Sequence, residues 1–337
     1  MAESLSLRWT IKASLATILS VAICCLGVTL LFFYQSIRRP VDIPERFLIV
    51  EPGEGLSSVA DQFVAQGLSK SRWPVMGWGL LSGVADSLQA GEYLIESKTT
   101  PAEILGKISR GEIFERKVTI IEGVTFRDFL KTLKKAQRLR HVLDEMSVEE
   151  IAMAIDYPHS TLEGSFFPAT YNYRHNESDL DLLSRAARKM SRERDAIWEE
   201  RIEAIAIQTP QEAVILASII QKEAMLESEM PTISGVLHNR LKKGMRLQVD
   251  PTVIYGLGPG FKGKLRRKHL KMDTPYNTYT RDGLPPGPIA SPGRAALRAA
   301  VQPEETEYLY FVAKGDGSHF FSRTLEEHNR AVKKYIR

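Results

Sequence analysis

A glutamate inside an apolar helical stretch is the residue best suited to chemistry in this sequence. Glu223 lies in LASIIQKEAM, residues 216–225. At about 100° per residue, Glu223 falls at the centre of the apolar face of a helix predicted over 209–230. The apolar residues within roughly 60° of it are Leu216, Ile219, Ile220, Leu226 and Met230. The sequence therefore predicts a carboxyl group buried among aliphatic side chains.

Burial of a carboxyl group favours its protonated form. Moving an unpaired carboxylate out of water is costly, so its pKa rises. A carboxylic acid that stays protonated near neutral pH can act as a general acid, and glycoside cleavage requires such a group. The alternative is a structural Glu223 that pairs with an arginine or a backbone donor. Asp250 is the nearest candidate for a second carboxylate, although Asp before Pro is also common in turns and caps.

Two loop segments could contact a polymer. Residues 275–293, PYNTYTRDGLPPGPIASPG, combine aromatic rings, amides and hydroxyls. Sugar rings pack on tyrosine faces while sugar hydroxyls bond to amides and backbone groups. A plain surface loop is the alternative. The basic run 262–271, KGKLRRKHLK, is either a solvated face or a contact for acidic envelope polymer or lipid head groups.

Other chemistries lack their motifs here. The sequence has no HExxH pair, no G-x-S-x-G elbow, no phosphate loop and no dinucleotide fingerprint. The seven histidines are scattered, so neither a metal nor a cofactor is predicted. The net charge of +4 is small and nucleic-acid-binding motifs are absent, so no nucleic-acid partner is expected.

An uncharged segment near the N-terminus predicts a membrane helix. Residues 13–34, ASLATILSVAICCLGVTLLFFY, are long enough to cross a bilayer. A buried core helix is the alternative, and the nearly balanced flanking charges do not fix an orientation. Both cysteines, Cys24 and Cys25, lie in this segment. A cysteine-free remainder is compatible with a bacterial periplasm or cell surface.

The rest of the chain divides into a mixed part and a helical part. Three strand–turn–helix units are predicted before residue 140, and the second helix has a capping box at Thr100 and Glu103. Helices dominate afterwards. The charged helix over 179–202 is expected to be a solvated face with many ion pairs. A strand at 307–314, a hairpin turn at 314–321 and a closing helix at 325–336 complete the prediction.

These motifs together resemble the endolytic murein transglycosylases, the MltG or YceG-like proteins of the bacterial inner membrane. The resemblance covers nearly the whole chain. It is most specific in LASIIQKEA, HNRLKKGMRLQVDPTVIYGLG and YNTYTRDGLPPGPIASPG, and it includes LQAGEYLI, VTIIEGVTF and LEGSFFPATYNY. The family's catalytic glutamate falls on Glu223. Many members carry Glu where this chain has Gln221, so Gln221 is not expected to be essential.

The resemblance implies an α+β chain with four parts after a cytoplasmic tail at 1–12. These are a transmembrane helix at 13–34, a linker at 35–46, a small LysM-like α+β subdomain at 47–115 and a mixed α/β catalytic domain at 116–337. The expected location is the bacterial inner membrane, with a single pass, a short cytoplasmic N-terminus and the catalytic domain in the periplasm.

The implied activity is endolytic lytic transglycosylation. The chain would cut the MurNAc–GlcNAc bond of nascent peptidoglycan strands, leave 1,6-anhydroMurNAc ends and limit strand length. Glu223 would act first as acid and then as base, without a cofactor. Peptidoglycan synthases are candidate partners. The candidate substrate-binding residues are Gln248, Asp250, Tyr255, Tyr276, Asn277, Thr278, Glu163, Phe167, Pro168 and Tyr171.

Three alternatives remain open at this stage. A non-catalytic peptidoglycan-binding scaffold would use the LysM-like unit and the anchor alone. A hydrolytic muramidase would use Asp250 as its second carboxylate. A membrane-anchored protease or esterase would need a triad or metal motif that the sequence lacks.

Overall fold

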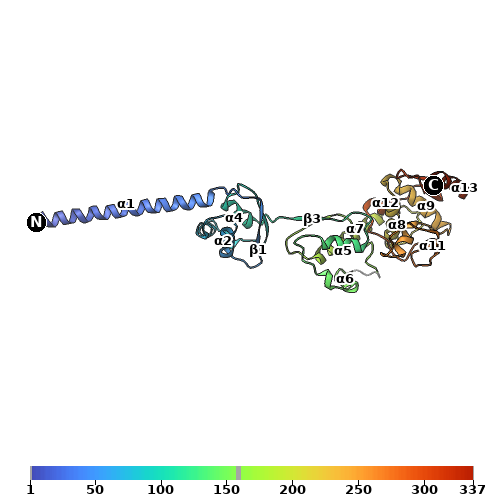
Figure 1. Ribbon diagram of the computed structural model, residues 1–337, viewed down its shortest axis with the longest axis horizontal. Helices are drawn as coiled ribbons and strands as arrows, with labels where there is room; N and C mark the ends of the chain where they lie inside the picture. Colours follow the sequence, from blue (N-terminus) through green and yellow to red (C-terminus); the bar gives the residue numbers. More distant parts are fainter. Residues whose placement is uncertain (1, 157–160, 337) are drawn as a thin grey trace. The chain divides into compact units, whose positions relative to one another are not determined.

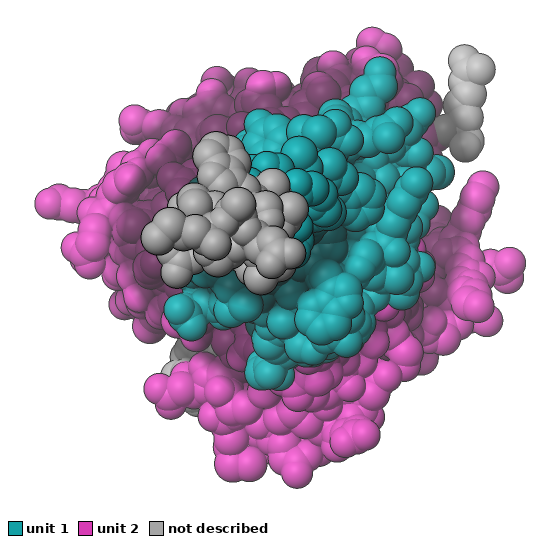
Figure 2. Space-filling model, turned by 90° about the vertical axis from the view of Figure 1, so that its left-hand side faces the viewer, with its two compact units in different colours: residues 1–116 teal, residues 117–337 magenta. Residues whose placement is uncertain are grey.

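The structure, a computed structural model, describes residues 2–156 and 161–336. It contains two compact units, residues 1–116 and 117–337, which are coloured separately in Figure 2. The described chain mixes helices with three two-stranded sheets, so the predicted combination of α and β elements with one apolar N-terminal helix is confirmed. Figure 1 labels most of these elements along the chain.

The N-terminal helix α1 (Ala2–Arg38) is long and apolar enough between Ser14 and Arg38 to span a membrane. Its apolar side chains, such as Leu19 and Phe32, are exposed. The helix continues past the predicted end at residue 34. It does so because its last turn packs on the rest of unit 1, where Ile37 is fully buried and the Arg38 guanidinium lies 5.0 Å from the Trp78 ring. The predicted linker therefore begins inside this helix.

The remainder of unit 1 contains two of the predicted strand–helix units. Strand β1 (Arg46–Val50) pairs antiparallel with β2 (Gly91–Ile95), with Leu48 opposite Tyr93. The helices of this unit are α2 (Leu56–Ala65), α3 (Arg72–Leu81), η1 (Val84–Asp86) and α4 (Pro101–Arg110). The capping box of Thr100 and Glu103 forms at the start of α4 as predicted. Helix α3 was not predicted, because RWPVMGWGLL has no clear helical period.

Helices dominate after residue 140, as predicted. The elements from residue 116 onward are β3 (Arg116–Thr119), α5 (Phe126–Lys134), η2 (Leu143–Glu145), α6 (Val148–Ala154), β4 (Thr170–Tyr173), α7 (Asp179–Glu199), α8 (Pro210–Glu223), η3 (Glu227–Glu229), α9 (Met230–Lys242), α10 (Asp250–Gly256), α11 (Arg267–Leu270), α12 (Arg294–Val301), β5 (Tyr310–Ala313), β6 (His319–Ser322) and α13 (Leu325–Tyr335). Strand β3 pairs with β4, and β5 forms the predicted hairpin with β6.

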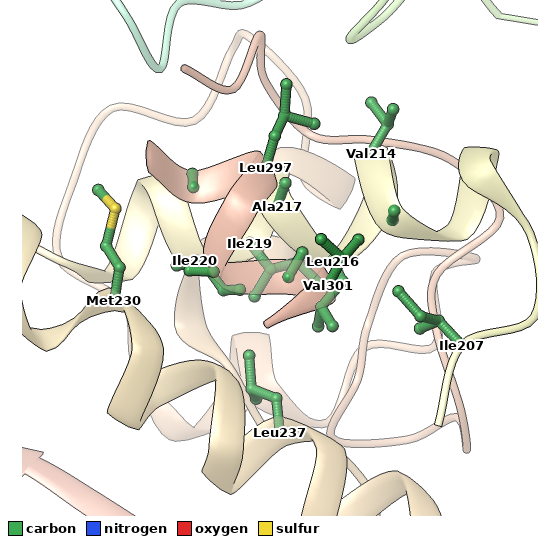
Figure 3. Packing of buried hydrophobic residues seen from close by; sticks show 14 of the residues in the cluster. Ile207, Val214, Leu216, Ala217, Ile219, Ile220, Met230, Leu237, Leu297 and Val301 are labelled. Atoms are coloured by element: carbon green, nitrogen blue, oxygen red, sulfur yellow. The ribbon is translucent and has the colours of Figure 1, made fainter. Parts of the chain in front are cut away.

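Helix α8 is the centre of the core of unit 2. It begins at the expected signal, a capping box of Thr209 and Glu212 with Pro210 in the first turn. Its apolar side chains pack between α9 and α12, as Figure 3 shows. The labelled contacts include Leu216, Ile219, Ile220, Leu237 and Val301. Burying each such side chain contributes about 1.5–3 kcal/mol, so α8 is held firmly along its length.

The prediction of one helix over 209–230 is wrong at its C-terminal end. Helix α8 ends at Glu223, because Ala224 adopts an extended conformation and α9 starts separately at Met230. Leu226 is 43% exposed instead of facing the core. The apolar pattern continues across the break, so periodicity did not reveal it. Pro231 in the first turn of α9 was the available signal, since proline favours that position.

The buried Ser218 connects the loop at Ile289 to α8 through hydrogen bonds. The Ser218 hydroxyl donates to the Ile215 carbonyl (2.7 Å) and accepts the Ile289 N–H (3.0 Å). Ser218→Ala leaves that buried N–H unpaired, so we expect the free energy of unfolding to fall by about 1–3 kcal/mol. Chemical denaturation of the full chain in detergent measures this value. The exposed Ser228→Ala is the control, and an equal effect of both changes would contradict the account.

Candidate active site

Glu223 is the last residue of α8 and lines a cavity of about 460 Å³. Its side chain is partly buried. Loss of hydration and, as a second cause, the carboxylate of Asp250 raise the pKa of this carboxyl to about 8. The C-terminal end of a helix carries partial negative charge, which also disfavours an anion there. Glu223 is therefore a neutral carboxylic acid at neutral pH.

The absence of partners distinguishes Glu223 from a structural carboxyl. Within the described residues, the Glu223 carboxyl group makes neither a hydrogen bond nor an ion pair. Glu163 is also buried, with its pKa raised to about 7 by desolvation. However, both its oxygens accept hydrogen bonds, from the Phe126 N–H (2.9 Å) and the Tyr255 hydroxyl (3.2 Å). Glu223 thus has the free, cavity-facing proton that a general acid needs.

The polar residues that line the cavity with Glu223 include Asp250, Tyr279 and Gln248. Asp250 starts α10, and its Oδ1 accepts a hydrogen bond from Tyr279 Oη (2.6 Å). Burial, and then this bond, raises the pKa of Tyr279. The third residue, Gln248, has φ of 54°, an unusual left-handed conformation for a residue other than glycine. The strained backbone at Gln248 thus places its side chain at the cavity, next to Asp250.

A buried arginine fixes the backbone around this wall. The Arg240 guanidinium donates to the carbonyls of Leu309 (2.6 Å) and Leu247 (2.9 Å) and to Gln248 Oε1 (3.2 Å). It also lies 5.0 Å from the Tyr310 ring. Among the described residues it has no carboxylate partner. One side chain therefore joins α9, the segment before α10 and the strand β5, and it places a positive charge at the cavity.

The opposite wall comes from the C-terminal hairpin and helix. These lining residues are Tyr310, Phe311, Val312, Ala313, His319, Leu325, His328, Asn329, Val332 and Ile336. His319 Nδ1 lies 2.7 Å from Glu229 Oε2, which connects the hairpin to the segment after α8. Sequence reasoning missed this wall, since it follows Glu223 by some ninety residues. The aromatic pattern in β5 and β6 was the only local signal for it.

Comparisons with known proteins identify the family of this chain. The model of the YceG-like family matches residues 48–334. The chain belongs to the YceG-like family. An endolytic murein transglycosylase of Bacillus subtilis is 30% identical over 328 residues, covering 90% of each chain. One from Streptococcus pneumoniae is 26% identical over 282 residues, covering 74% of this chain, which spans 51% of that relative's length.

A solved structure gives the same assignment. The crystal structure of a YceG-like protein from Listeria monocytogenes superposes with a TM-score of 0.53 and 27% identity, covering 85% of this chain and 98% of that one. The family predicted from the motifs is thereby confirmed.

Other predicted substrate-binding residues of this YceG-like chain lie beside the cavity or away from it. Asn277 is fully buried, and its amide donates to the carbonyls of Leu270 (3.1 Å) and Met272 (2.7 Å). The Thr278 hydroxyl accepts the Val249 N–H (3.1 Å). These two side chains shape the loop that carries Tyr279. Their contact with substrate stays a prediction.

The remaining predicted residues form a second group. The rings of Tyr255 and Tyr276 are 4.7 Å apart, and Tyr255 bonds to Glu163 as described above. Phe167 and Pro168 are buried. Tyr171 is buried as well, donates to the Phe167 carbonyl (2.5 Å) and lines a different cavity. The predicted site residues are therefore divided among at least two places in the YceG-like fold.

The raised pKa of Glu223 predicts a pH-dependent stability difference. The folded chain holds the Glu223 proton up to about pH 8, whereas the unfolded chain releases it near the ordinary value of 4.5. The folded state therefore binds more protons in this window, and its stability falls as the pH rises through it. Glu223→Gln removes this loss. We expect the variant to unfold at a higher temperature than the parent at pH 8.

The measurement is thermal unfolding of both proteins from pH 4 to pH 9. Their difference should grow from pH 4.5 to 8 and stay constant above pH 8. The exposed Glu227→Gln is the matched control, because it removes one carboxylate from the next short helix. A difference between Glu223→Gln and the parent that does not vary with pH would contradict the raised pKa.

Proposed function

We propose that this chain is an endolytic lytic transglycosylase that cuts the MurNAc–GlcNAc bond of peptidoglycan strands. The observation that carries the proposal is the neutral, unpartnered carboxyl of Glu223 on the wall of a polar cavity. Relatives of the chain are named endolytic murein transglycosylases, which supports a peptidoglycan substrate.

In the proposed reaction Glu223 acts twice. Its carboxyl proton passes to the glycosidic oxygen as the bond to C1 of MurNAc breaks, and GlcNAc leaves with a free hydroxyl. The Glu223 carboxylate then accepts the proton of the C6 hydroxyl of MurNAc while that oxygen bonds to C1. The product is 1,6-anhydroMurNAc, no water is consumed, and Glu223 is protonated again. An isolated acid with a pKa near neutrality suits both steps.

The setting of the reaction follows from the other elements. We infer that α1 anchors the chain in the inner membrane, with residues 1–12 in the cytoplasm and unit 2 in the periplasm. The domain at 47–115 is proposed to be LysM-like, and that at 116–337 to be catalytic. In this role the enzyme would limit the length of nascent strands beside a peptidoglycan synthase. The apolar length of α1 supports the anchor.

Asp250 supports a second candidate, a hydrolytic muramidase. It is exposed, lines the same cavity as Glu223 and acts on it electrostatically. A water molecule activated by Asp250 could attack C1 in place of the C6 hydroxyl. The two reactions differ in their products, because hydrolysis leaves a hydrated MurNAc end.

Mass spectrometry of digested peptidoglycan tests the proposed reaction. We expect anhydro ends from the parent protein. Glu223→Gln should lower kcat/KM by about 10²- to 10⁴-fold, since it removes both proton transfers. Glu227→Gln serves again as the control. Hydrated ends would reject the lytic mechanism, and a folded Glu223→Gln protein with full cellular function would favour the non-catalytic scaffold.

Asp250→Asn separates the two reactions further. In the lytic reaction Asp250 only helps to hold the proton on Glu223, so the variant should keep cutting. Its activity should decline at a lower pH than that of the parent, because the carboxylate that raises the Glu223 pKa is gone. The pH profile of kcat/KM measures this shift. Complete loss of cutting at every pH would instead assign Asp250 the role of base.

A further inference from the structure

A second cavity in unit 2 is lined by four cations, and three of them have no acidic partner among the described residues. It has a volume of about 500 Å³, in the range of small-ligand sites. Its walls are one face of α7 and the strand β4. The lining residues are Thr170, Tyr171, Asn172, Arg185, Arg188, Lys189 and Arg192. None of them lines the cavity of Glu223.

The cations follow the helical period of α7. Arg185, Arg188, Lys189 and Arg192 lie on one stripe, while the opposite face packs in the core through residues such as Leu183 and Met190. Like charges four residues apart on a helix repel one another. The positive charges of this stripe therefore destabilise α7. An anion in the cavity would reduce the repulsion between them.

Most of this charge is not neutralised within the protein. Arg185 bonds to Glu177 Oε1 (2.6 Å) and to the Asn172 carbonyl (2.8 Å). In the described chain, by contrast, no carboxylate lies within 4.0 Å of Arg188, Lys189 or Arg192. The predicted face with many ion pairs is therefore wrong for this stripe. The pairs that do form on α7 include Arg194 with Asp195 and Glu193 with Arg294.

Aromatic rings lie against one of the cations of this cavity. The Lys189 ammonium lies 5.1 Å from the Phe167 ring and 6.0 Å from the Tyr171 ring, which holds its stem against buried rings. Thr170 and Asn172 are exposed at the strand and add a hydroxyl and an amide. Guanidinium groups match planar oxygen pairs, while the amide and hydroxyl suit peptide groups. This mixture fits a carboxylate-bearing peptide better than a bare anion.

We propose that this cavity binds the carboxylates of the peptide stems on the peptidoglycan strand. The inference rests on the proposed function, which supplies peptidoglycan as the substrate. The enzyme would then recognise the peptides attached to a strand at a site separate from Glu223. An anionic lipid head group shares the phosphate or carboxylate chemistry, and binding to vesicles separates it from the peptide stems.

Binding to uncut strands tests the proposal without relying on activity. Full-length Glu223→Gln protein in detergent is titrated with soluble strands that carry stems, and with the same strands after amidase has removed them. The test variant adds Arg188→Ala, Lys189→Ala and Arg192→Ala. The matched control adds Lys262→Ala, Lys264→Ala and Arg267→Ala, which remove the same charge from an exposed run.

We expect the stem-bearing strands to bind more tightly, and the test variant to lose about tenfold in affinity for them only. The control variant should keep the preference. Since Lys189 contacts the core, Arg188→Gln with Arg192→Gln is a second test that changes exposed side chains alone. Equal affinity for both kinds of strand, or equal losses in test and control variants, would overturn the proposal.

Two further experiments distinguish lipid binding from peptide binding and test the enzyme activity separately. Binding to phosphatidylglycerol vesicles that depends on the same three cations, without a preference for stems, would assign the cavity to lipid and overturn the proposal. Cutting of the stem-bearing strands by the chain with Glu223 intact tests the proposed function independently. Failure of that cutting alone, with the stem preference intact, would reject the enzyme and keep the peptide site.

Discussion

The hydration that Glu223 loses at the end of α8 is the constraint on which the site depends. A carboxyl with its pKa near 8 is held neutral at neutral pH by its surroundings. Those surroundings supply no donor in the described structure, and the nearby Asp250 adds repulsion. The same arrangement that weakens the fold at alkaline pH keeps a proton available for transfer.

Side chains of α8 that precede Glu223 hold backbone groups of neighbouring loops in place. Ser218 accepts the N–H of Ile289, and Gln221 Oε1 accepts the N–H of Gly293 (2.9 Å). Lys222 donates to the Gly123 carbonyl (3.2 Å). Gln221 thus has a structural contact, and a carboxylate at this position could accept the same N–H. This explains physically how an amide can stand where the resemblance to the family implies Glu in many members.

Local signals in the sequence predicted much of the fold, because capping boxes and apolar periods act over a few residues. The start of α8 at Thr209 and the hairpin of β5 and β6 are examples. The end of α8 was not predictable from periodicity, since the apolar pattern continues past Glu223. The wall from α13 depends on tertiary packing and has no local signal. Tyr171 is another example. Its motif position predicted a place at the substrate site, but it lines the second cavity and not that of Glu223.

The most direct measurement is the titration of the Glu223 carboxyl itself. Difference infrared spectroscopy between the full-length parent and Glu223→Gln isolates the C=O stretch of this one protonated acid. The account predicts a carboxylic acid band that persists at neutral pH and disappears with a midpoint near pH 8. A band that disappears near the ordinary value of 4.5 would contradict it, because Glu223 would then be ionised when it should donate its proton.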